Sequence, residues 1–206
     1  MKRSLLFLMC AALLAMMAAP AMAQDVSKAD RAALVKYLNE TRDKLEKATK
    51  GLSAAQLSFK SAPDRWSIAE CMEHIAAGED FLYDILTSKV MTSPAPAGPF
   101  DAAKAHEADA QVKKFVTDRG NKMKAPEPVV PNNRYGSANG SWQHFLDSRA
   151  RSIAFAQKEG GLRNHAMDGP AAKDMDAYQW MLYLSGHSAR HTAQILEVKA
   201  DAKFPK

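Results

Sequence analysis

Residues 178–198, YQWMLYLSGHSARHTAQILEV, carry two histidines four positions apart within a pattern of apolar residues. The positions that recur at steps of three or four, the spacing of one face of an α-helix, are Trp180, Leu184, His187, His191, Ile195 and Val198. Both imidazoles are therefore expected to point into the protein. Histidines at i and i+4 lie roughly 6 Å apart along a helix axis, so their ring nitrogens can converge on one ion.

This histidine pair is half of a metal site, and the same pattern is also typical of two core histidines bonded to backbone carbonyls. Ser188 follows His187, and no carboxylate lies between the two histidines. The H-E-x-x-H motif, in which the glutamate is the general base of a zinc protease, is therefore absent. A metal site requires a further ligand from elsewhere in the chain.

Residues 1–23 have the organisation of a secretory signal peptide. Lys2 and Arg3 precede an apolar run over residues 5–19, and Ala21-Met22-Ala23 forms an A-x-A cleavage site. We expect cleavage after Ala23 and a periplasmic or secreted protein whose residues 24–206 form a single domain. No apolar stretch in this mature chain is as long as a membrane span.

Charge and cysteine content limit which partners and which sources of stability we expect for this protein. The chain has 28 lysines and arginines against 23 acidic residues, and the signal segment removes two of the positive charges. The remaining excess of three is spread along the chain, so a nucleic-acid partner is not expected. Only Cys71 remains in the mature chain, which rules out an intramolecular disulfide. In an oxidising compartment the fold must then depend on its core or on a metal.

The clearest helix start in the chain is Trp66-Ser67-Ile68-Ala69-Glu70, because Ser67 and Glu70 form a capping box. Along the helix that begins there, His74 shares a face with apolar residues, and this is the third histidine predicted to lie inside. Gly78, one turn later, either allows a neighbouring helix or ligand to approach closely or is merely tolerated. Glu70 is explained by capping, although a carboxylate one turn from His74 could also support a metal-bound imidazole.

Three further helices complete the pattern. One extends from Ser27 to about Lys50, a weaker surface helix covers 101–119, and another begins at a cap on Ser141. Arg149 lies within the apolar stripe of the last of these, where it either extends to the end of the core or binds an anionic group such as a substrate. Residues 53–63 read as a connection. The sequence thus predicts an all-α fold: a four-helix bundle with a long crossover between the second and third core helices.

The chain also resembles a known family in several blocks spread over most of its length. These are Arg42, the WSIAECMEH block at 66–74, KAPEPVVP at 124–131 and HSARH at 187–191. In this order they resemble the DinB-like superfamily of metal-binding four-helix bundles. The resemblance implies that His74, His187 and His191 bind a divalent ion. Some relatives transfer low-molecular-weight thiols or isomerise substrates with a thiol cofactor, but the signal peptide sets this chain apart from cytosolic thiol transferases.

Three neutral imidazoles would leave the ion with an open position, and zinc or nickel suits such ligands best. Two hypotheses follow. In the first, the protein is an exported metal-dependent hydrolase or transferase acting on a small molecule, with Arg149 orienting an anionic substrate. In the second, the bundle is not catalytic, and the ion is structural or mediates the binding of a partner. The sequence is compatible with a homodimer.

Overall fold

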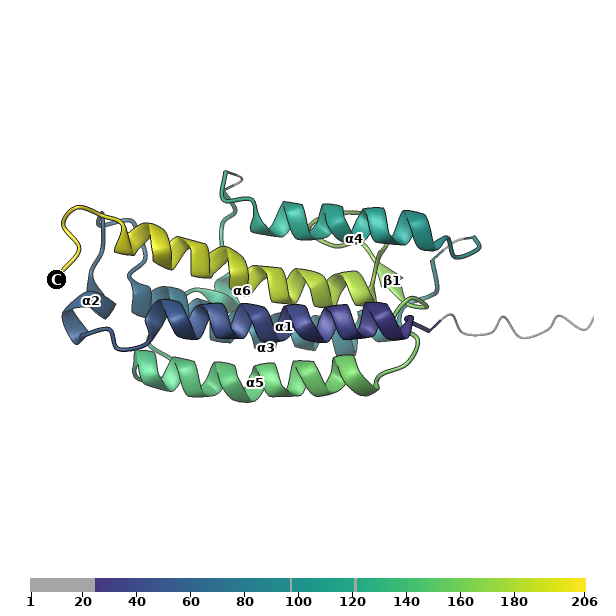
Figure 1. The fold of residues 1–206 in the computed structure, drawn as a ribbon, viewed down its shortest axis with the longest axis horizontal. Coiled ribbons are helices and arrows are strands. Elements are labelled where there is room, and N and C mark those ends of the chain that lie inside the picture. Colours follow the sequence, from purple (N-terminus) through teal and green to yellow (C-terminus); the bar gives the residue numbers. More distant parts are fainter. Residues whose placement is uncertain (1–24, 97, 121) are drawn as a thin grey trace, which may run out of the picture.

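Four long helices form the core of the computed structural model, which describes residues 25–96, 98–120 and 122–206 (Figure 1). They are α1 (Lys28–Thr49), α3 (Ile68–Ser88), α5 (Ala138–Lys158) and α6 (Ala177–Lys199). The predicted all-α four-helix bundle is confirmed. The expected signal segment, residues 1–23, lies outside the described residues. No helix in the described part has the length and apolar character needed to cross a membrane.

Side-chain caps fix where these helices begin. Ser67 accepts a hydrogen bond from the amide of Glu70, and the Glu70 side chain accepts one from the amide of Ser67, as the sequence predicted. The prediction that Ser141 caps α5 is wrong. Ser137 is the cap, and Ser141 lies inside the helix with its hydroxyl donating to the Ser137 carbonyl. A serine one turn into a helix can make this bond to the preceding turn, so the two positions look alike in sequence.

The shorter elements lie in the connections. A short helix, α2 (Ala54–Ser58), interrupts the segment expected to be an irregular connection, and it has a capping box of its own. The 3₁₀ turns η1 (Val90–Thr92) and η2 (Glu127–Val129) flank α4 (Ala102–Thr117). The strands β1 (Ala166–Met167) and β2 (Met175–Asp176) pair in antiparallel fashion just before α6. Asp176 caps α6 and forms a capping box with Gln179.

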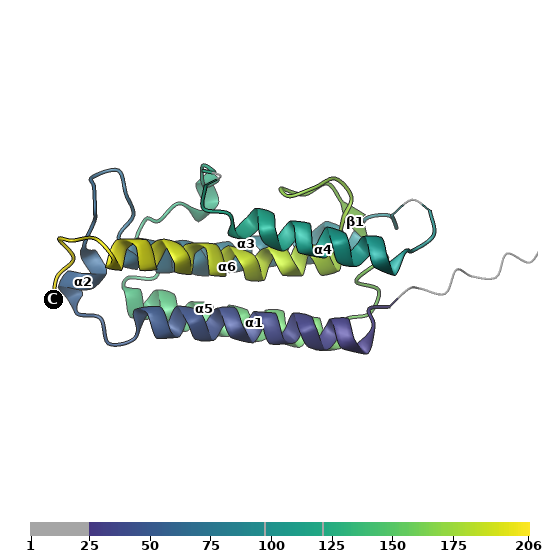
Figure 2. The same cartoon turned by 45° about the horizontal axis from the view of Figure 1, so that its top comes forward.

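The order of the helices around the bundle explains the long crossover. The chain direction shows that α3 and α5 are parallel neighbours, as are α1 and α6, whereas α3 and α6 are antiparallel (Figures 1 and 2). A connection between parallel neighbours has to return along the whole length of the bundle. Helix α4 makes this return along the outer side of α6, where Val112 and Val116 are buried. Its predicted place at the surface is confirmed.

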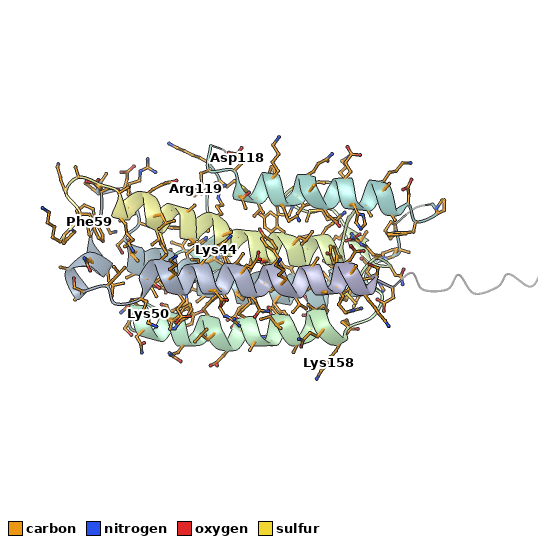
Figure 3. The ribbon with its side chains drawn as sticks, viewed as in Figure 1. Lys44, Lys50, Phe59, Asp118, Arg119 and Lys158 are labelled. Carbon is orange, nitrogen blue, oxygen red and sulfur yellow. The ribbon has the colours of Figure 1, made fainter. Side chains whose placement is uncertain are left out.

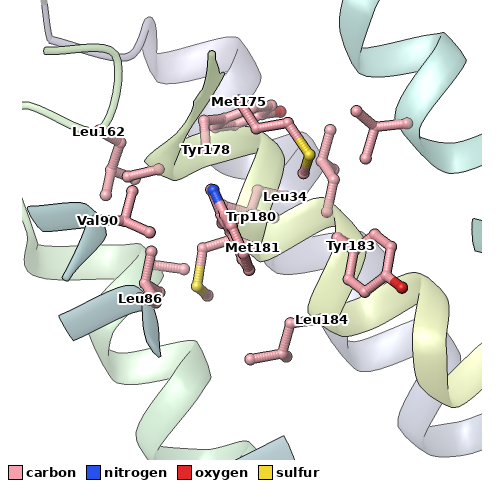
Figure 4. Close-up of a cluster of buried hydrophobic side chains, with 14 of the residues drawn as sticks. Leu34, Leu86, Val90, Leu162, Met175, Tyr178, Trp180, Met181, Tyr183 and Leu184 are labelled. Carbon is pink, nitrogen blue, oxygen red and sulfur yellow. The ribbon is translucent and has the colours of Figure 1, made fainter. Parts of the chain in front are cut away.

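The interior consists of two apolar clusters separated by a polar layer. One cluster includes Leu34, Leu86 and Leu184 (Figure 4), and the other includes Leu45, Ile75 and Phe145. Between these positions, each core helix contributes polar side chains that are fully or almost fully buried: Thr41, Glu79, Arg149, Ser152, Ser185 and Ser188. We call these six residues the polar layer. A hydrogen-bonded layer of this kind ties all four helices together at mid-height.

Candidate metal centre

Three histidines from two antiparallel helices meet beside the polar layer. The Nε2 atom of His74 lies 3.1 Å from Nε2 of His191 and 3.0 Å from Nε2 of His187. Candidate ligand atoms of the three residues all lie within 4.8 Å of one another. His74 comes from α3, whereas His187 and His191 come from consecutive turns of α6. The structure therefore brings together all three histidines that the sequence predicted.

The hydrogen bond on the other side of each ring decides which nitrogen faces the cluster. Nδ1 of His74 is 2.8 Å from the backbone carbonyl of Val129. A carbonyl oxygen can only accept, so Nδ1 carries the proton and Nε2 keeps its lone pair. Nδ1 of His191 is 2.9 Å from Oε1 of Gln194, which fixes the same tautomer. Neither Val129 nor Gln194 was identified from the sequence.

Two lone pairs therefore face each other at 3.1 Å between His74 and His191, with no proton left to share in the neutral rings. Burial lowers the pKa of His74. The pKa values of His187 and His191 lie well below the usual value, mainly because the rings are buried and further because of the neighbouring histidines. Protonation of the imidazole rings is thus disfavoured, so it does not relieve the repulsion between the lone pairs. Imidazole nitrogens that share one ion at about 2.0–2.1 Å are separated by roughly 3–3.5 Å. The three residues fit a divalent metal ion.

Gly78 makes room for the third ring. A Cβ atom at this position would lie 2.5 Å from Cε1 and 2.9 Å from Nδ1 of His187. No side chain larger than hydrogen fits there unless the ring moves. Of the two interpretations of Gly78 drawn from the sequence, the structure supports close approach of a neighbouring helix.

The crossover is fastened to α3 next to the metal centre. The carboxylate of Glu73 accepts hydrogen bonds from the backbone amides of Asn132, Asn133 and Arg134 at 2.8–3.0 Å. Burial alone would raise the pKa of Glu73, but these amides lower it, so the side chain is ionised at neutral pH. Glu73 thereby holds the segment that supplies the Val129 carbonyl. Glu70, considered from the sequence as a support for His74, instead caps α3 and pairs with Lys60.

Arg149 does not take the role that the sequence suggested for it. All five of its N–H donors are used inside the polar layer, and the side chain is fully buried. Two donate to the Glu79 carboxylate at 2.7–2.8 Å, and the others to the Leu38 carbonyl and to the hydroxyls of Thr41 and Ser188. The anion that Arg149 binds is thus Glu79 of the protein itself. Arg149 does not line the pocket beside the histidines, and the expectation that it orients a substrate is wrong.

A pocket of about 580 Å³ opens beside the three histidines. Its walls come from α3, α6, the segment before α3 and the crossover between α4 and η2. Trp66 forms part of the wall, with its ring centroid 4.6 Å from that of His74 and 6.1 Å from that of His191. Volumes of about 300–1,000 Å³ are typical of sites for small molecules. An ion at the histidines would therefore be within reach of a small ligand.

Comparisons with known proteins agree with this architecture. The chain is similar to the uncharacterized protein YuaE of Bacillus subtilis (strain 168), with 26% identity over 165 residues, which cover 78% of this chain and 94% of YuaE. Its fold is similar to that of YfiT from Bacillus subtilis, with a TM-score of 0.51 at 17% identity over 84% of this chain and 88% of YfiT. The YfiT structure is described as a probable metal-dependent hydrolase with an unusual four-helix bundle topology.

The model of the DinB superfamily matches residues 37–195, which include all of α3 and α5 and the three histidines. This match covers most of the chain. The chain belongs to the DinB superfamily.

Proposed function

We propose that this protein binds a divalent metal ion, zinc or nickel, through His74, His187 and His191 and uses it to hydrolyse a small molecule or to transfer a group from it. The observation that carries the proposal is the convergence of three Nε2 atoms at the wall of a pocket, with two of the rings fixed by acceptors at Nδ1. Neutral imidazoles leave the charge of the ion uncompensated.

Different residues of the chain would orient the histidines around such an ion and admit a substrate to it. When bound, a divalent ion supplies Lewis acidity toward a carbonyl or phosphoryl oxygen. Val129 and Gln194 hold the rings of His74 and His191 in the ligating tautomer. Trp66 and the crossover form walls of the pocket through which a substrate would approach the histidines. The description of YfiT as a probable metal-dependent hydrolase supports hydrolysis in particular.

Metal analysis together with a substrate panel tests this proposal. We expect stoichiometric metal in the purified protein and none in the His74→Ala variant. Activated esters, amides and phosphoesters are then assayed with wild type and with His187→Ala, after circular dichroism has shown that the variant is folded. Turnover that is lost in folded His187→Ala supports the proposal.

The opposite results are equally informative. A protein that purifies without metal and takes up none from zinc or nickel solutions contradicts the metal centre. Stoichiometric metal with a large loss of melting temperature on chelation, but with no turnover of any substrate in the panel, supports the non-catalytic bundle instead.

Export is a separate part of the proposal and rests on the signal-like residues 1–23. The mass of the protein recovered from its native host should correspond to residues 24–206, and the protein should be found outside the cytoplasm. An intact amino terminus on cytoplasmic protein would contradict export without affecting the metal centre.

A further inference from the structure

The pocket beside the histidines has an apolar end. Because α3 and α6 are antiparallel, Gly78 lies against His187 and His74 against His191. One turn beyond Gly78 on α3 are Phe81 and Leu82, which line the pocket. One turn before His187 on α6 is Tyr183, which also lines it. These three side chains therefore lie on the same side of the histidines.

The opposite end of the pocket is charged. Beyond His191, α6 contributes Glu197, and the segment before α3 contributes Arg65. Arg119, just after α4, donates two hydrogen bonds to the Glu197 carboxylate, at 2.9 and 3.0 Å. The histidines thus lie between an apolar group of side chains and a charged one.

Positive charge is in excess along the pocket walls. Five basic side chains line it, against the two carboxylates of Asp64 and Glu197, and the histidines are neutral. Arg119 is paired with Glu197, and Arg190 donates to backbone carbonyls at the end of α4. Lys122 and Lys124 make no hydrogen bond or ion pair within the described ranges 25–96, 98–120 and 122–206. Their ammonium groups are available to an incoming anion.

We propose that the pocket selects small amphipathic organic acids. The apolar part of such a molecule would pack against Phe81, Leu82 and Tyr183, and its acid group would be held by Lys122 and Lys124. This assignment deepens the proposed function, because the three apolar side chains and the two lysines line the same pocket as the histidines.

The proposal is tested by calorimetric titration with three probes. These are 4-phenylbutyrate, its neutral analogue 4-phenylbutyramide, and butyrate, which lacks the ring. We expect 4-phenylbutyrate to bind about tenfold more tightly than either of the others, the change that one charge-assisted contact or one buried apolar group provides. Each titration is run on metal-loaded and on chelator-treated protein, because a carboxylate can also bind to an ion directly.

Matched variants identify the residues responsible. Lys122→Gln/Lys124→Gln should abolish the preference for the acid over the amide and leave amide binding and metal content unchanged. Lys44→Gln/Lys158→Gln removes the same charge from exposed positions that do not line the pocket. Figure 3 shows Lys158 on the side of the molecule opposite Arg119. This control should bind all three probes as wild type does.

Several outcomes would overturn the proposal. A preference for the acid that disappears when metal is removed would mean that the ion alone attracts it. A preference for the acid that survives in Lys122→Gln/Lys124→Gln would show that the lysines do not hold the acid group. Equal binding of acid and amide to wild type would show the same. In each case metal content and turnover are measured separately, so selectivity can fail while the metal-dependent function stands. A protein without metal could still show the lysine-dependent preference.

Discussion

Gly78 is the residue on which the geometry of the histidine cluster depends most closely. The imidazole of His187 occupies the space that a Cβ atom at this position would fill, with Cε1 at 2.5 Å. The His187 ring could turn away from an added methyl group, but its Nε2 would then leave the neighbourhood of His74. Gly78 thus makes the helix less stable, but it allows the ring of His187 to lie next to His74.

Gly78→Ala should therefore weaken metal binding without unfolding α3. Alanine favours a helix over glycine by about 1 kcal/mol, which offsets part of the steric cost. We expect a loss of metal affinity of about 10- to 100-fold, the range produced when the support of a ligand is removed. Competition with a chromophoric chelator measures the affinity. Gly160→Ala, where an added Cβ meets nothing within 4 Å, is the control, and equal affinity in both variants would show that His187 tolerates displacement.

The three histidines that meet in the cluster could be predicted from the sequence, but not the groups that orient them. Helical periodicity places His74, His187 and His191 inside because the apolar residues around them define the buried face. The acceptor for His74 is the carbonyl of Val129, 55 positions along the chain. Every residue has a backbone carbonyl, so the residue type does not indicate this acceptor. It can be identified only from the path of the crossover. The apolar stripe likewise placed Arg149 on the inward face, but it indicated neither the full burial of this side chain nor its partner Glu79.

At the scale of helices, the polar layer is the strongest link between elements. Arg149 of α5 bonds to Glu79 of α3, to Leu38 and Thr41 of α1, and to Ser188 of α6. Both members of the Arg149–Glu79 ion pair are buried, with side chains 0% and 1% exposed. Loss of one partner of such a buried pair destabilises a protein more than replacement of both, because it leaves the other charge buried and unpaired.

Arg149→Met should lower the free energy of unfolding by about 3–5 kcal/mol, because it leaves the Glu79 carboxylate buried and unpaired. The double variant Arg149→Met/Glu79→Gln should be less destabilised than the sum of the single changes. Urea denaturation followed by circular dichroism gives these values. Arg151→Met removes an arginine whose side chain is 50% exposed and which pairs with Asp80, and should cost about 1 kcal/mol or less. Equal effects of Arg149→Met and Arg151→Met would show that the layer contributes little.

A second link, between α3 and α5, should depend on pH. Asp80 accepts hydrogen bonds from His144, Ser148 and Arg151. Burial alone would raise the pKa of Asp80, but these partners lower it below the ordinary value of 3.8. The folded state therefore binds the proton less readily than the unfolded state. The stabilisation is complete above the unfolded pKa and is lost as the pH falls through the folded pKa.

Asp80→Asn should accordingly be less stable than wild type at neutral pH, and the difference should shrink as the pH falls below 3.8. Free energies of unfolding measured from neutral pH to about pH 2 give this comparison. Asp147→Asn changes an exposed aspartate on α5, the helix that supplies the partners of Asp80, and should follow the wild-type curve. A difference between wild type and Asp80→Asn that does not change with pH would contradict the assignment of Asp80.

The helices were more predictable than the points where they begin. Their apolar stripes and the Ser67 capping box are local signals, and α1, α3 and α6 appear where these signals placed them. Serines at positions 137 and 141 are equivalent by local criteria, and the structure has Ser137 as the cap. The short α2 is only five residues long, too brief for a periodic pattern. Local signals thus predict the long helices, whereas the choice between two similar cap positions is not visible in them.

At the scale of the whole molecule, a metal ion at the three histidines would join α3 to α6. Removing it should lower the stability of the entire bundle, because only the folded chain brings these residues together. Free metal at 100 times its dissociation constant stabilises a protein by about 2.7 kcal/mol. For a chain of this size we expect chelation to lower the melting temperature by roughly 5–10 °C.

Differential scanning calorimetry with and without chelator measures this shift. The same experiment on His187→Ala should show almost no dependence on chelator. A wild-type melting temperature that is unaffected by chelation, in protein shown to contain metal, would contradict the role of the ion as a link between helices.

The parallel arrangement of α3 with α5 and of α1 with α6 also bears on the order of folding. His74 and His187 are 113 positions apart, and the contacts between these core helices join distant parts of the chain. Chains dominated by such distant contacts fold more slowly than bundles whose successive helices pair. Because His187 and His191 lie on α6, the histidine cluster cannot form until α6 has packed against α3. Metal uptake would thus be a late event that follows the assembly of the helices.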